Sequence, residues 1–121
     1  IVNSSVAAFN HDNMDEAMRI EPLEQVVDAL IKEIKARHVR RLRDGMCTVE
    51  YGFVLEDLLT AYGRTADHCS NVAVEMLQVA EGKLEAHEYL GALKAGELQE
   101  SAQFTKRFNA YKEKYAFDKE Q

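Results

Sequence analysis

The 121-residue sequence has a single proline, Pro22, and only six glycines. All-β folds need frequent turn residues between short strands, so this scarcity argues against them. Hydrophobic residues make up 46% of the chain, and a domain of this length removes enough apolar surface from water to sustain a core. We therefore expect one all-α domain over residues 1–121.

The chain is also poor in cysteine. Cys47 and Cys69 are too few and too isolated for a disulfide framework or a zinc site, which uses ligand pairs two to four residues apart. Two isolated thiols fit a reducing compartment. The sequence shows no glycine-rich phosphate loop, no zinc helix motif and no nucleophile with an obvious positioned base. It therefore predicts a protein that is not an enzyme, with no evident small-molecule substrate.

Long apolar runs and an excess of positive charge are missing too. No run approaches the ~18 to 20 residues that span a bilayer, and the start shows no signal-peptide pattern. With 15 basic and 21 acidic residues the formal charge is −6, which argues against nucleic acid as a partner. The basic cluster between Lys35 and Arg43 suits the negative end of a helix dipole, and an anionic membrane surface is its alternative partner.

Helical spacing of apolar residues divides the first half of the chain. Residues 1–9 predict the end of a helix that begins upstream in a longer chain, and their apolar surface favours a homodimer. Asp12 or Asn13 is expected to cap the next helix. An amphipathic pattern then runs from Met14 to about Asp44, with Pro22 bending or splitting the helix near Glu21.

A second long helix is expected from the cap Thr48 to Glu81 or Gly82. A short turn of helix around residues 87–93 and a last helix over residues 97–116 follow. The last helix aligns an aromatic stripe that we assign to the core, made of Leu98, Phe104, Phe108, Tyr111 and Tyr115. Because Gly45 and its neighbours form a short link, the long helices should pack as an antiparallel hairpin, closed into an up-and-down bundle by the last helix.

The hairpin brings polar residues of the two long helices together. Positions whose numbers sum to about 92 to 95 should lie at one height. This places Glu24 and Asp28 opposite Asp67 and Asn71, an oxygen-rich group suited to a hard or borderline cation. The alternative is an ordinary ion-pair cluster in which Arg64 neutralises Asp28 and Asp67. The same register sets His38 beside Asp57.

Apolar spacing on the second long helix also predicts its buried face. Leu55, Leu59, Tyr62, Ala66, Cys69 and Ala73 share one face of this helix. Leu59 and, on the first long helix, Leu30 are expected core positions. A di-iron carboxylate enzyme is disfavoured, because the residues three before the four histidines are Ala8, Lys35, Thr65 and Leu84 rather than glutamate.

Two motifs resemble a known family. Glu24-Gln-Val-Val-Asp28 is similar to the first acidic motif of PhoU-like domains, and Gly63-Arg-Thr-Ala-Asp67-His-Cys-Ser-Asn71 to the second. The run from His38 to Cys47, the stretch from Asp57 to Asn71 and His87-Glu-Tyr-Leu90 most resemble the cytosolic C-terminal domain of bacterial sodium/phosphate cotransporter proteins. The resemblance covers most of the chain from about residue 14.

The resemblance implies an all-α PhoU-like bundle with three main helices and an N-terminal helix remnant. It implies a non-enzymatic regulatory role in phosphate transport, on the cytoplasmic side of the bacterial inner membrane, with the membrane transport domain of the same polypeptide as partner. If the family's metal ligands are carried over by position, the metal site consists of Glu24, Asp28, Asp67 and Asn71, and its ion is divalent or iron-type. Gly63 stands where the family has an acidic residue, so a tight cluster is not expected. The three remaining carboxylates suffice for one weakly held ion at most, and the absence of metal is the favoured interpretation.

Overall fold

The computed structural model describes residues 1–80 and 102–118. All regular structure in these ranges is helical, and the elements are α1 (Val2–His11), α2 (Met14–Ala17), α3 (Ile20–Arg43), α4 (Val49–Ala80) and α6 (Ala102–Lys114). The predicted all-α class is confirmed. The turn of helix predicted at residues 87–93, the end of the second long helix at residue 81 or 82 and the start of the last helix at residue 97 lie outside the described residues.

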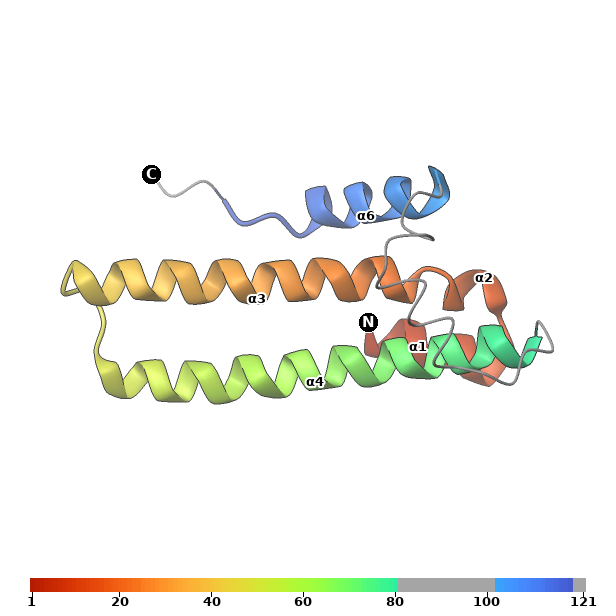
Figure 1. The fold of residues 1–121 in the computed structure, drawn as a ribbon, viewed down its shortest axis with the longest axis horizontal. Helices are drawn as coiled ribbons and strands as arrows, with labels where there is room; N and C mark the ends of the chain where they lie inside the picture. The colour runs from red at the N-terminus through yellow and green to blue at the C-terminus, as the bar shows by residue number, and fades with distance from the viewer. Residues whose placement is uncertain (81–101, 119–121) are drawn as a thin grey trace.

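The long helices α3 and α4 form the predicted antiparallel hairpin (Figure 1). The turn begins at Gly45, whose φ of 71° lies in the left-handed region that glycine adopts without strain. The Met46 N–H donates to the Arg41 carbonyl at 2.8 Å, which satisfies a carbonyl of the last turn of α3. At the other side the Tyr51 N–H reaches the Thr48 hydroxyl at 3.5 Å, so Thr48 caps α4 as expected.

The break ahead of α3 lies earlier than the proline pattern predicted. The helix is split, but the interruption falls at Met18 and Arg19, between α2 and α3, instead of near Glu21. Pro22 is the third residue of α3, where a helix has no intrahelical partner for its N–H groups, so the missing donor costs nothing. Asn13 caps α2, accepting a hydrogen bond from the Glu16 N–H at 3.1 Å.

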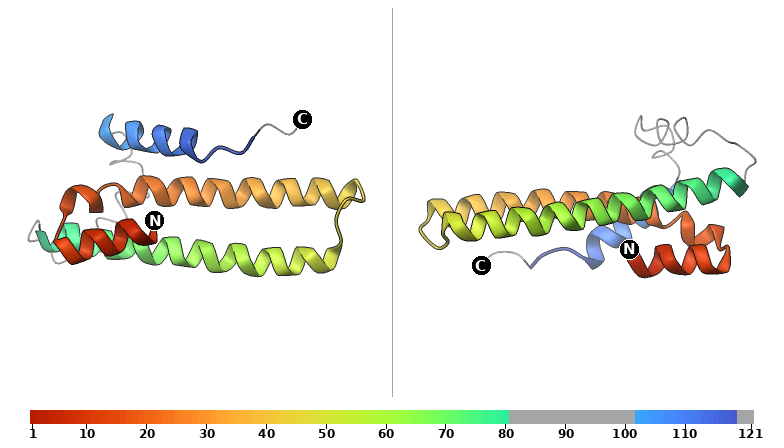
Figure 2. Two further views of the ribbon diagram at one scale, coloured as in Figure 1. Left: turned by 180° about the vertical axis from the view of Figure 1, so that it is seen from behind. Right: turned by 90° about the horizontal axis from the view of Figure 1, so that it is seen from below.

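Two further elements, α1 and α6, pack on the hairpin. α1 packs against α4 and α6 mainly on α3, and the right-hand view of Figure 2 shows both on the same face of the hairpin (Figures 1 and 2). The predicted all-α bundle is confirmed, with the last helix packing mainly on α3 rather than equally on both long helices. Neither α1 nor α6 packs beside the end of the hairpin that carries the turn (Figure 1).

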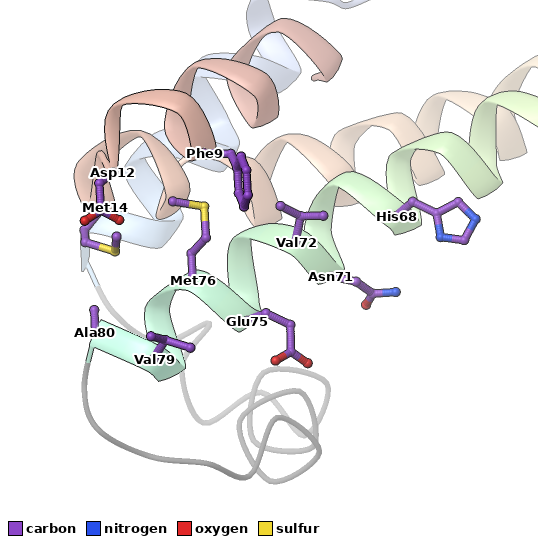
Figure 3. A pocket seen from close by; sticks show the side chains of 10 residues that line it. All are labelled: Phe9, Asp12, Met14, His68, Asn71, Val72, Glu75, Met76, Val79 and Ala80. Atoms are coloured by element: carbon purple, nitrogen blue, oxygen red, sulfur yellow. The ribbon is translucent and has the colours of Figure 1, made fainter.

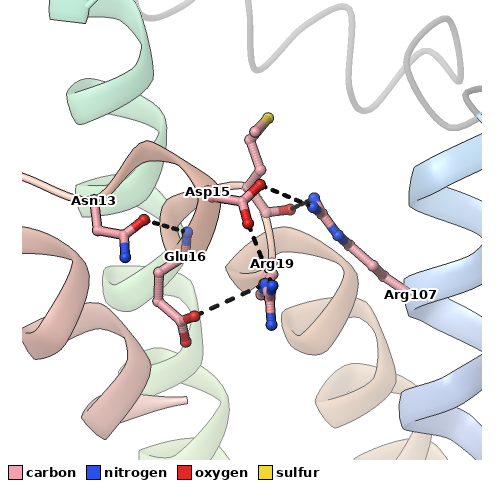
Figure 4. Close-up of polar contacts among 6 residues, drawn as sticks. Asn13, Asp15, Glu16, Arg19 and Arg107 are labelled. Carbon is pink, nitrogen blue, oxygen red and sulfur yellow. Dashed lines mark hydrogen bonds and ion pairs between the residues drawn. The ribbon is translucent and has the colours of Figure 1, made fainter.

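Polar contacts fasten α6 to the α2 region (Figure 4). Arg107 donates to the Met18 carbonyl at 3.2 Å and lies 3.4 Å from the Asp15 carboxylate. Asp15 also pairs with Arg19 at 3.3 Å. α6 buries no residue completely: Phe104, Phe108 and Tyr111 are half-buried and Tyr115 is exposed. The predicted aromatic stripe lies against α3 without becoming core, because nothing covers its outer side among the described residues.

The core is made of small side chains and lies where α1, α2, α3 and α4 meet. Its cluster consists of Ala8, Ala17, Ile20, Cys69 and Ala73. On α4 the predicted face is largely right, since Leu59 and Ala66 are buried as well. Tyr62 is 62% exposed and Leu30 only half-buried, so neither is a core position. Within the described ranges, no helix has both the length and the apolar character to cross a membrane.

Candidate functional site: the acidic pocket between α3 and α4

The four residues predicted as a site line one cavity. Glu24 and Asp28 on α3 and Asp67 and Asn71 on α4 surround a space of about 540 Å³. We call it the acidic pocket; its remaining lining is Glu21, Gln25, Ala29, Lys32, Ser70 and Phe108. The antiparallel hairpin therefore brings together residues about forty or more positions apart. The pocket opens on α6, which contributes Phe108.

A lysine neutralises part of the pocket. The Lys32 ammonium lies 2.7 Å from the Asp28 carboxylate, one turn earlier on α3. The hydrogen bond to Asp28 and the charge of that carboxylate raise the pKa of Lys32 above its ordinary value. The expected ion-pair partner of Asp28 was Arg64, and the structure replaces it with Lys32. Both side chains are more than half exposed, so the pair adds little stability.

The floor of the pocket is a hydrogen bond that the sequence did not indicate. The Ser70 hydroxyl donates to the Glu21 carboxylate, and Glu21 also accepts from the Gln25 amide at 3.3 Å. Ser70 is 4% exposed, so this bond joins α3 to α4 away from water, where its loss would leave a polar group unsatisfied. The predicted register did not set positions 21 and 70 at one height, because their numbers sum to 91, just below its range.

Gly63 faces α3, but the packing of the two helices at this height does not require a glycine. A Cβ added at Gly63 would be 3.4 Å from the Ile31 Cδ1 atom, at ordinary van der Waals distance. Among the residues that the structure describes, no three His, Cys, Asp or Glu side chains are grouped so that they could hold a metal ion. In this arrangement the pocket residues do not fit a tightly bound metal cluster.

Nearer the turn, the observed alignment of α3 and α4 gives His38 a different neighbour from the predicted one. His38 faces Gly52 rather than Asp57, and a Cβ on Gly52 would be 2.7 Å from the His38 Nε2 atom. The His38 side chain is buried, and its Nε2 atom has no hydrogen-bond partner. Asp57 points to solvent. The predicted His38–Asp57 pair is therefore wrong, because the helices meet about two to five residues closer to the turn than the register assumed.

A second cavity lies on the other side of α4 (Figure 3). It has a volume of about 730 Å³ and is lined by Phe9 of α1 and by Val72, Met76 and Val79 of α4, with His68 and Asn71 at its polar end. His68 and Asn71 belong to the polar stripe seen in the sequence. The structure therefore gives Asn71 a place on the rims of two cavities, one acidic and one largely apolar.

Comparisons with known proteins agree with the motifs and the fold. The family model described as the PhoU domain matches residues 1–76, from α1 through most of α4. The chain is 27% identical over 96 residues to the phosphate-specific transport system accessory protein PhoU homolog 1 of Thermotoga maritima, an alignment that covers 79% of this chain and 41% of that protein. The chain thus spans less than half the length of this relative. No solved structure matches. The family match covers more than half of the chain, which therefore belongs to the PhoU domain family.

Proposed function

We propose that this chain is a non-enzymatic regulatory domain of phosphate transport. The observation that carries the proposal is the PhoU domain match over residues 1–76, which takes in both acidic motifs. The Thermotoga maritima relative is named as an accessory protein of a phosphate-specific transport system. The motifs of this chain most resemble the domain at the C-terminus of sodium/phosphate cotransporters. We therefore place it on the cytoplasmic side of the bacterial inner membrane, joined to a membrane transport domain of the same polypeptide.

The chemistry of the described residues supports a role in binding and regulation. The acidic pocket offers carboxylates, two amides, one ammonium group and one hydroxyl, and that hydroxyl, of Ser70, is buried on the Glu21 carboxylate. The pocket lies between α3 and α4, so a change in its charge would act on the packing of the two helices. Such a site suits control of a partner domain better than turnover of a substrate.

A deletion experiment tests this function. Removing the segment that encodes residues 1–121 from the full-length gene should leave sodium-dependent phosphate uptake in place at low phosphate, while its decrease at high phosphate is lost. Uptake of labelled phosphate in cells, corrected for the amount of transporter in the membrane, is the measurement. If the deleted transporter responds to phosphate as the intact one does, the domain is not the regulator. If uptake in the intact strain does not require sodium, the link to a cotransporter is wrong.

Weak binding of one divalent cation in the acidic pocket is a second candidate function. It is favoured by the shared cavity of Glu24, Asp28, Asp67 and Asn71, since carboxylate and amide oxygens are the donors that hard cations prefer. Titration with Mn²⁺, followed by calorimetry or paramagnetic broadening of amide signals, should show binding in the millimolar range. Because the Lys32 ammonium pairs with the Asp28 carboxylate, Lys32→Met should free this carboxylate and strengthen Mn²⁺ binding. Asp67→Asn removes a carboxylate from the pocket and should weaken Mn²⁺ binding.

The matched control for the cation is Asp57→Asn. Asp57 is an exposed acid on the same helix that does not line the pocket, so its loss should leave Mn²⁺ binding unchanged. Equal binding by Asp57→Asn, Asp67→Asn and Lys32→Met would show that Mn²⁺ collects on the acidic surface in general and would reject the pocket as a cation site.

A further inference from the structure

The turn end of the hairpin carries a group of exposed apolar side chains. Neither α1 nor α6 packs beside this end (Figure 1), so among the described helices only α3 and α4 shield its side chains. We call residues 39–54, from the last turn of α3 into the first turns of α4, the hairpin tip. Its large apolar side chains that are 58–70% exposed are Val39, Met46, Val49, Tyr51, Phe53 and Val54. Apolar surface gathered in this way marks an interaction site.

The hairpin tip also carries a local excess of positive charge. Its charged residues are Arg40, Arg41, Arg43, Asp44 and Glu50. Three arginines and two acids give the tip a formal charge of +1, and since the whole chain carries −6, the remaining residues carry −7. Asp44 lies 3.1 Å from Arg43. Glu50 lies in the first turn of α4, where hydrogen bonds from its own backbone N–H and from Thr48 lower its pKa. Both acids are thus offset within the tip, and the arginines set the charge that a partner meets.

The exposed side chains surround the hairpin tip instead of lining one side of it. Tyr51 and Phe53 are two residues apart on α4, so they point about 200° apart around its axis. Gly52, between them, faces His38 of α3, so the two aromatic side chains lie on opposite sides of the hairpin. A rigid protein surface would cover one of these sides and leave the other in water. A lipid surface closes around a segment that enters it, so it can contact both.

The apolar and basic side chains lie at heights that suit a membrane interface. Because His38 faces Gly52, positions of the two helices whose numbers sum to about 90 lie at one height. Arg41 is therefore level with Val49. From Val49 to Phe53, α4 rises by about 6 Å, within the ~5–10 Å to which interfacial segments are buried. Arginine side chains at this level have apolar stems along which their charged ends reach the phosphate layer.

We propose that the hairpin tip docks on an anionic membrane surface, with Val49, Tyr51 and Phe53 entering the interfacial layer and the three arginines of the tip contacting lipid phosphates. Each basic residue near such a surface strengthens binding about 5-fold. An inserted aromatic side chain adds about 150–250 Å² of surface removed from water. The hairpin then stands on the membrane by its turn, and the acidic pocket is held away from the lipid, since Asp28 lies about 24 Å along α3 from its end. The proposal does not depend on the regulatory function.

Sedimentation of the 121-residue chain with lipid vesicles tests the binding. The chain should bind vesicles made of equal parts phosphatidylglycerol and phosphatidylcholine at least ~10-fold more tightly than vesicles of phosphatidylcholine alone. Raising the salt from about 0.1 M to about 0.5 M should release it. Arg40→Gln should weaken binding about 5-fold. The matched control is Arg64→Gln, which should leave binding unchanged, because the exposed Arg64 lies about 23 Å along α4 from its first residue, more than two Debye lengths at about 0.1 M.

A tryptophan reporter tests which part of the chain enters the lipid. The sequence has no tryptophan, so Phe53→Trp and its control Tyr62→Trp each introduce a single one. Both positions are exposed on α4, by 70% and 62%, but Tyr62 lies outside the hairpin tip. Anionic vesicles should shift the fluorescence emission of the Phe53→Trp protein to shorter wavelength and leave that of the Tyr62→Trp protein unchanged. Circular dichroism checks that both variants remain helical.

Several results would overturn the proposal. Equal binding to the two kinds of vesicle, or equal losses for Arg40→Gln and Arg64→Gln, would mean that the arginines of the tip do not recognise the lipid charge. Equal emission shifts for Phe53→Trp and Tyr62→Trp would mean that the side of the hairpin, instead of its tip, contacts the lipid. A chain that binds neither kind of vesicle would mean that the tip serves a protein partner instead of a membrane.

Discussion

Replacing Gly52 with leucine is expected to lower the free energy of unfolding by roughly 1–3 kcal/mol, the usual cost of forcing a larger side chain into a packed contact. The first added atom would already lie 2.7 Å from His38 Nε2, closer than two such atoms can approach. His38 is buried between the two long helices, so its ring has little room to move. The helices must separate near the turn, and urea unfolding followed by circular dichroism measures the loss.

The control for this substitution is provided by Gly63 in the same helix. A Cβ there meets Ile31 at 3.4 Å, an ordinary contact, so Gly63→Ala should gain up to ~1 kcal/mol from better helix propensity. Adding His38→Ala to Gly52→Leu should recover part of the loss, since the two side chains compete for one space. A Gly52→Leu protein as stable as the original would show that α3 and α4 do not approach closely at this height.

The helices and their limits follow from local chemistry that the sequence displays. Asn13, Thr48 and Gly45 act within three residues of themselves, as caps and as a left-handed stop. The gathering of Glu24, Asp28, Asp67 and Asn71 around one pocket follows almost as directly, because a short turn leaves little choice in how two long helices align.

What could not be predicted depends on small shifts between elements. A displacement of a few residues along the hairpin replaces Asp57 with Gly52 as the neighbour of His38. It does so without moving any residue to another face of its helix. Asp28 pairs with Lys32, one turn along its own helix, instead of with Arg64 of the other helix. Periodicity marks which side of the last helix is apolar, but does not say which of the two long helices it will pack against.

Replacing Ile20 with alanine is expected to cost about 2–5 kcal/mol of the free energy of unfolding. Ile20 is fully buried, and its cluster consists otherwise of Ala8, Ala17, Cys69 and Ala73. Alanine side chains have no rotamers with which to fill the space left by the lost atoms, so the cavity should persist and the cost should lie toward the upper part of this range. For a domain stabilised by ~5–15 kcal/mol, that is a large fraction.

The loss should also be local, because Ile20 is where α1 and α2 meet the hairpin. Arg19, between α2 and α3, forms ion pairs with Asp15 and Glu16. If α2 loosens, the peptide bond after Arg19 becomes accessible to trypsin. Ile20→Ala should therefore be cleaved after Arg19 faster than the intact chain. Ile34→Ala removes the same atoms from a half-buried position on the same helix, and should cost less and leave cleavage at Arg19 unchanged. Equal losses for the two variants would mean that the small-residue cluster does not hold α1 and α2 onto the hairpin.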